Sequence, residues 1–206
     1  MRRFKFPLIA GLLILGGCAH LLNRVSYSHM SPRFAYQGFS FDRPPNRHWY
    51  LLRSEESYTA VILRRETGFS KTHTFYAQVA LASIARQPLS HADFAALLRA
   101  ENEPHRVTYE VRKLSDEQTL ATIQNQWCVR FDKIALVRGA PVAPDDELRM
   151  IIRGFRCLHP AFPKATVDFF YSERGRPGDL DPALAEEGER FLQGVRIDVA
   201  PGTPAA

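Results

Sequence analysis

Apolar and polar residues alternate along much of the chain, and this period of two predicts β-strands. The alternation is clear around Tyr109, where Val107, Tyr109 and Val111 are separated by polar residues. Strands are predicted at residues 36–41, 48–52, 58–64, 72–84, 106–114, 147–158, 165–172 and 195–199, with one or two more within 119–137.

Two stretches have the period of an α-helix instead. Residues 90–102 begin at Ser90, a favourable N-cap. Residues 182–193 begin at Pro182, and proline is preferred at the first helical position. Most links between strands look too short for crossovers, so neighbouring strands should be antiparallel. The expected fold class is α+β, with one mostly antiparallel central sheet and both helices packed on one face of it.

The start of this predicted domain resembles the opening of PsbP-like domains. The residues that carry the resemblance are Tyr36-Gln37-Gly38-Phe39-Ser40-Phe41, followed by Pro44-Pro45 and Trp49. In that group an aromatic Gly-Phe strand leads through proline to tryptophan. The resemblance implies a PsbP-like antiparallel sheet with flanking helices for residues 36–199. The group includes the extrinsic PsbP subunit of the photosystem and small envelope lipoproteins, which mostly act as accessory or assembly factors.

The first eighteen residues have the pattern of an export signal. Basic residues precede a short apolar run that ends in small residues, and the run is shorter than the ~20 residues that a membrane-spanning helix needs. The ending Leu15-Gly16-Gly17-Cys18 resembles the bacterial lipobox, in which the cysteine is acylated and the signal is cleaved just before it. We expect residues 1–17 to be a signal peptide and Cys18 to carry the lipid anchor. The alternative is a transmembrane anchor in which Cys18 is an incidental thiol.

The position of this signal predicts where the protein acts. The domain should be anchored to membrane lipid through Cys18 in the bacterial cell envelope, facing the periplasm. Ala19 follows the cysteine, and by resemblance to lipoproteins of enteric bacteria this favours the outer membrane. Residues 18–35 lack a clear period and are interpreted as a spacer, and residues 200–206 as a disordered tail.

Charge leaves no case for a nucleic-acid partner. The formal net charge is +5, but residues 1–17 hold three basic residues and no acidic one, so the processed chain would carry only +2. An envelope protein is the expected partner, and no cofactor is expected.

Two cysteines remain after Cys18, and export would place them in an oxidising compartment. Cys128 and Cys157 are therefore predicted to form a disulfide. Both alternate away from the more apolar side chains of their strands, so we expect the bond on the less buried side of a sheet. Two free thiols or a metal pair are the alternatives. With a free thiol, His159 would lie close enough in sequence to activate Cys157.

No catalytic motif stands out. Ser70 and His73 are close in sequence, but three residues apart in an extended chain they point to opposite faces. Acidic residues surround the start of the second helix, where they complement the helix dipole. The function expected is a non-enzymatic accessory, assembly or binding role. The alternative is a periplasmic hydrolase or thiol-dependent enzyme whose residues come together only in the fold.

Overall fold

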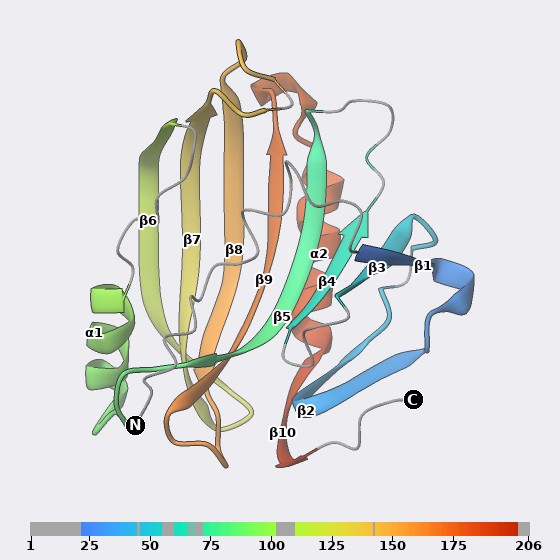
Figure 1. Ribbon diagram of the computed structural model, residues 1–206. Helices are drawn as coiled ribbons and strands as arrows, with labels where there is room; N and C mark the ends of the chain where they lie inside the picture. Colours follow the sequence, from blue (N-terminus) through green and yellow to red (C-terminus); the bar gives the residue numbers. More distant parts are fainter. Residues whose placement is uncertain are drawn as a thin grey trace.

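The computed structural model describes residues 22–44, 46–54, 60–65, 67, 72–101, 110–141 and 143–201. The strands of its main sheet are β1 (Leu22–Ser26), β3 (Trp49–Ser54), β4 (Ala60–Arg65), β5 (Thr74–Ser83), β6 (Glu110–Ile123), β7 (Gln126–Arg138), β8 (Leu148–Leu158) and β9 (Ala165–Gly175). These eight strands pair in the order β1-β3-β4-β5-β9-β8-β7-β6, and every neighbouring pair is antiparallel (Figure 1).

A second, two-stranded sheet pairs the beginning of the chain with its end. It consists of β2 (Arg33–Asp42) and β10 (Val195–Pro201), which are antiparallel. The helices are α1 (His91–Glu101) and α2 (Pro182–Gly194), with short 3-10 turns at Tyr27–His29 and Pro177–Asp179. Within the described residues, neither helix is long and apolar enough to cross a membrane. The sheet-dominated α+β class and the positions of both helices are confirmed.

The stretch predicted to hold one or two strands contains most of a hairpin. β6 and β7 are joined by Gln124 and Asn125, whose φ angles are 50° and 64°. Positive φ at both central residues is the conformation of a type I′ hairpin turn, and asparagine tolerates it better than most residues.

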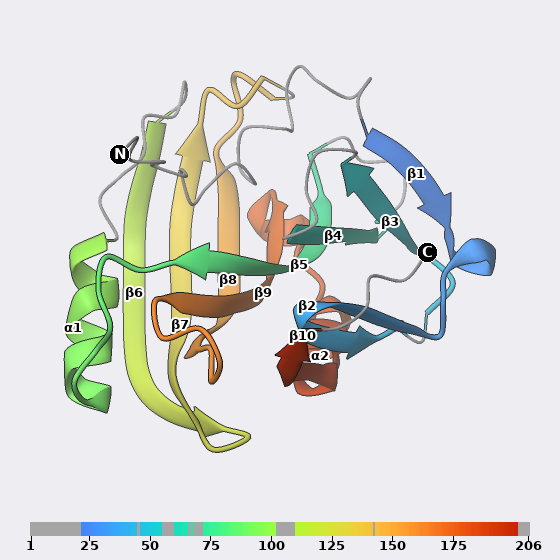
Figure 2. The same ribbon diagram turned by 60° about the horizontal axis from the view of Figure 1, so that its bottom comes forward.

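The two helices cover opposite faces of the main sheet, so the expectation that both pack on one face is wrong. Side chains of successive strand residues point to opposite faces. In β7, Val129 packs in the cluster under α1, whereas its neighbour Cys128 belongs to the core cluster that includes Phe191 of α2. We call these sides the α1 face and the α2 face. Figure 2 shows α1 beside β6, and α2 beside β2 and β10.

The fold begins earlier than the sequence indicates. Leu22–Ser26, predicted to lie in a spacer, pairs with β3, and Met30 and Phe34 are each 4% exposed in the main core. Burial therefore explains why Met30 and Phe34 are apolar, although this segment follows no period. Residues 18–21 lie outside the described part of the chain.

Candidate functional site

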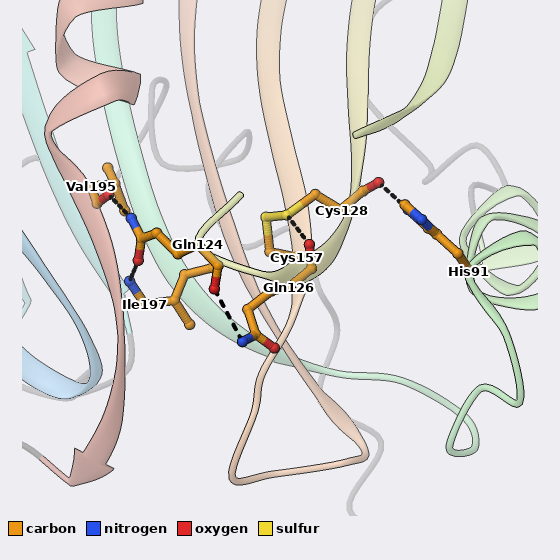
Figure 3. The surroundings of a disulfide bond; sticks show 7 residues. All are labelled: His91, Gln124, Gln126, Cys128, Cys157, Val195 and Ile197. Atoms are coloured by element: carbon orange, nitrogen blue, oxygen red, sulfur yellow. Dashed lines mark hydrogen bonds between the residues drawn. A yellow bond between two sulfur atoms is a disulfide. The ribbon is translucent and has the colours of Figure 1, made fainter. Parts of the chain in front are cut away.

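The structure tests the predicted cysteine pair but not the predicted lipid site. Cys18 lies outside the described residues, so its acylation stays a prediction. Cys128 and Cys157 lie opposite each other in β7 and β8 and form a disulfide (Figure 3). Their Cα atoms are 4.0 Å apart, slightly closer than the expected range of about 4.4–6.8 Å. Because Cys157 is bonded, the thiol-dependent alternative loses its nucleophile.

The disulfide lies in the main core, not on the less buried side of the sheet. Both cysteines are 0% exposed and share a cluster with Val167, Phe169 and Ile197. Alternation within one strand shows which residues share a face, but it does not show what later covers that face. Here β10 and α2 cover the face that appeared less apolar.

Gln124, at the tip of the β6–β7 hairpin, joins the two sheets beside the disulfide (Figure 3). Its Nε2 donates to the Val195 carbonyl at 3.0 Å, and its Oε1 accepts from the Ile197 amide at 3.0 Å. The side chain thus pairs with β10 as another strand would. The disulfide thus joins the hairpin to β8, and the Gln124 side chain holds its tip against the small sheet.

His159, considered as a partner for Cys157, instead holds a turn. Its Nδ1 accepts from the amides of Ala161 and Phe162 at 3.1 and 3.2 Å. Its Nε2 lies against Gly38, where an added Cβ would come within 2.5 Å of it. Gly38 also has a φ of 88°, so both the close approach and the backbone conformation require glycine. Burial lowers the pKa of His159, and the Gly38 backbone and the charge of Asp198 act in the opposite direction.

This lowered pKa predicts a loss of stability in mild acid. As the pH falls, an unfolded histidine takes up a proton near pH 6.5, whereas the folded His159 does so only at a lower pH. The free energy of unfolding should therefore keep its highest value above pH 6.5 and decrease below it. His159→Asn keeps an acceptor for the two turn amides but cannot titrate. In urea unfolding at pH 7.5 and 5.5, the wild type should therefore lose more stability than His159→Asn. Equal losses would show that His159 is not the titrating group.

The other polar groups considered in the sequence also hold the fold together. His73 Nε2 donates to Glu173 at 2.8 Å, and both residues are buried; Ser70 lies outside the described residues. On α2, Glu187 accepts from the Trp49 indole at 3.1 Å, and Glu189 accepts from the Tyr171 hydroxyl at 3.2 Å. These glutamates fasten α2 to the sheet.

A line of side chains on the α1 face is a better candidate for function. Strand register places Gln78, Phe170, Gly154, Phe131 and Gln118 side by side across β5, β9, β8, β7 and β6. We call these five residues the cross-sheet row. In β7 the row lies two residues beyond Val129, where α1 packs. In β8 it lies two residues beyond Ile152, which packs on the small cluster that contains Met150, Ala140 and Ala143. The row therefore runs across five strands of the main sheet, and in β7 and β8 it lies between two covered regions.

Gly154 allows the aromatic rings of the row to meet. It has no side chain, so Phe131 and Phe170 on the strands to either side approach to 6.3 Å between ring centroids. Tyr76 adds a third ring, in an edge-on contact with Phe170 at 6.0 Å. All three rings are only half-buried. Glycine inside a strand often marks such a close approach.

Polar atoms around these rings lack partners. In the part of the chain that the structure describes, Gln78 Oε1, Gln118 Oε1 and Ser172 Oγ are buried atoms with no hydrogen-bond partner. Ser172 lies next to the cross-sheet row, two residues beyond Phe170 in β9 and opposite Tyr76 and Ile152. A buried acceptor without a partner costs about 1–3 kcal/mol, and such groups are rare in native proteins. These three atoms lie on one face of the sheet, where a ligand or partner would supply the missing hydrogen bonds.

Lys133 brings a positive charge to the edge of the row. Lys133 lies opposite Asp116 in the next line of residues, with its Nζ 5.5 Å from the centroid of the Phe131 ring. Burial lowers the pKa of Lys133, whereas the charge of Asp116 acts to raise it. The row thus combines aromatic surface, amide oxygens and a positive charge held near an aromatic face.

The cross-sheet row was not predicted from the sequence, although two features of the sequence are related to it. In β9, the aromatic residue Phe170 lies on the same face as the polar residues Asp168, Ser172 and Arg174. An aromatic residue among polar ones on one face of a strand is unusual. Gly154 stands in the middle of an otherwise apolar and basic strand. Read together, these two features indicate an aromatic residue that packs over a glycine.

One of the comparisons with known proteins found similar solved structures. No protein-family model and no curated protein matches this chain. Among solved structures, the solution structure of cyanobacterial PsbP (CyanoP) from Synechocystis sp. PCC 6803 is similar over 89% of this chain and 99% of that chain. The sequence identity is 10% and the TM-score 0.39. The match is to a PsbP protein, the group that residues 36–49 resemble, but at this TM-score it carries no argument about fold or function.

Proposed function

We propose that this protein is a lipoprotein of the bacterial envelope that binds an envelope protein and catalyses no reaction itself. It is anchored through Cys18, faces the periplasm and is sorted to the outer membrane. Its role is that of an accessory or assembly factor. The signal pattern that ends at Cys18 supports the anchoring, and the cross-sheet row supports the binding role.

The observation that carries the binding role is the set of unpaired acceptors in and beside the row. Gln78 and Gln118 stand at its two ends, four strand spacings or about 19 Å apart. The apolar rings of Phe131 and Phe170 lie between them. A matching partner presents hydrogen-bond donors at two separated points and apolar side chains between them. A protein segment that lies across the strands has this chemistry.

The ring geometry favours a protein over a glycan. Phe131 and Phe170 are inclined by 57°, and Tyr76 and Phe170 by 76°. Rings tilted in this way pack against one another and leave gaps that branched apolar side chains fill. They do not form the single flat platform on which a sugar ring stacks.

Replacement of one unpaired acceptor separates binding from folding. Gln78→Leu removes a buried polar atom that has no partner, so the free energy of unfolding should rise by about 1 kcal/mol while partner binding weakens. Binding can be measured in intact cells with a photo-crosslinking phenylalanine analogue at position 131. The same analogue at position 190, an exposed position on α2, is the matched control.

The expected result is one crosslinked envelope protein from position 131 and none from position 190, with less adduct in the Gln78→Leu background. A variant that is both less stable and less able to bind would assign Gln78 a structural role only. Equal adducts from both positions would contradict the proposal.

In the same cells, the Cys18→Ser protein should be absent from the membrane fraction. Correct processing of this variant with unchanged lipid labelling would refute the anchor.

A further inference from the structure

The outer strand β6 carries a charge pattern that is complementary to itself. Arg112 and Lys113 are followed, after two residues, by Asp116 and Glu117. Among the described strands β6 pairs only with β7, so its other edge has no strand partner there. The strand is fourteen residues long, and its first five are exposed. An unpaired edge is a template for another strand, and charges along it prevent pairing with strands whose charges do not match.

We propose that two copies of this protein pair through β6, antiparallel and about a two-fold axis between Leu114 and Ser115. This register places Arg112 opposite Glu117 of the second copy, and Lys113 opposite its Asp116. The two-fold axis repeats each contact, so a dimer contains four pairs of opposite charge. Cross-strand pairs of this kind stabilise antiparallel sheets, and a two-fold interface requires a surface complementary to itself.

A bulge in β6 makes this register possible. Residues opposite each other in a flat antiparallel pair must point to the same face. In a regular strand Arg112 and Glu117, five positions apart, would point to opposite faces. The register between β6 and β7 shifts between Lys113 and Ser115, which adds one residue to β6. As a result Arg112 and Glu117, opposite Leu136 and Asp132, both lie on the α2 face.

The same shift brings Lys113 and Asp116 to one face. They lie opposite Ala135 and Lys133, on the α1 face, and Lys113 Nζ already donates to Asp116 within one chain at 3.0 Å. Leu114 is the extra residue, is 49% exposed, and would lie beside the two-fold axis. The bulge, the exposed leucine and the charge order thus agree on one register, and this symmetry favours a second copy over an unrelated strand.

Paired cysteines test the register in the full-length protein in isolated membranes. Glu110 and Thr119 lie on the α2 face and would be opposite each other across the axis, so Glu110→Cys/Thr119→Cys should form a disulfide-linked dimer on mild oxidation. Glu110→Cys/Gln118→Cys is the matched control, because Gln118 lies on the α1 face. Dimer in the first variant and none in the control is the expected result, read on a non-reducing gel. No dimer, equal dimer in both, or linkage to a different protein would overturn the proposal.

Charge exchange tests the complementarity independently. In the Glu110→Cys/Thr119→Cys protein, Arg112→Glu creates two like-charge pairs per dimer. It should lower the yield of disulfide-linked dimer about tenfold. Adding Glu117→Arg to that variant exchanges the two charges and should restore the yield. Arg190→Glu, an exposed change on α2, should have no effect. Failure of the second substitution to restore crosslinking would show that Arg112 acts on folding and would refute the pairing.

Discussion

Replacing Cys128 and Cys157 together with alanine is expected to lower the free energy of unfolding by about 2–5 kcal/mol. The bond closes a loop between residues 29 apart, so its loss increases the conformational freedom of the unfolded chain. Both residues are also fully buried, and removing the two sulfur atoms leaves a small cavity in the main core. Urea unfolding of the wild type and of the double variant measures the effect.

Reduction supplies the control for this prediction. The wild type in a strong reductant should lose stability in the same range, whereas the double variant should be indifferent to reductant. Two titratable thiols in the folded, non-reduced protein would contradict the bond itself. If the bond is present but the double alanine variant is as stable as the wild type, the two hydrogen bonds of Gln124 to β10 would be sufficient to hold the hairpin.

Gly154→Ala is expected to destabilise the protein by about 3 kcal/mol, the upper part of the range for overpacked interiors. A Cβ at this position would lie 2.2 Å from the Phe169 carbonyl oxygen and 2.4 Å from the Phe170 Cβ. Relief of these contacts requires β8 and β9 to separate, because one of the clashing atoms belongs to the backbone of the neighbouring strand. Thermal or urea unfolding provides the measurement.

Gly178→Ala is the matched control, since nothing lies within 4 Å of a Cβ built there, and its stability should change by less than about 0.5 kcal/mol. The Gly154 variant should also disturb the cross-sheet row. Partner crosslinking from position 131 should therefore fall with Gly154→Ala and not with Gly178→Ala. A Gly154→Ala protein as stable as the wild type would show that the strands yield easily at this point.

Local patterns in the sequence determined most of the elements. Alternation located the strands, because a strand with one covered face repeats every two residues. Ser90 and Pro182 marked the starts of the helices, because capping depends on neighbouring residues alone: the Asp93 amide donates to Ser90 Oγ at 3.1 Å, as expected for an N-cap. The presence of two cysteines besides Cys18, behind a segment with the pattern of an export signal, was sufficient to predict their bond.

Only the tertiary structure decided which face of each strand is covered, and by what. The period of β7 separates Cys128 from Val129, but it contains no information about α2, which lies more than fifty residues later and covers the cysteine. The cross-sheet row depends in the same way on the register of five strands, which brings Gln78 and Gln118 to the ends of one line. Register and layer order are set by long-range packing of the whole sheet, whereas period, capping and cysteine number are properties of short stretches of chain.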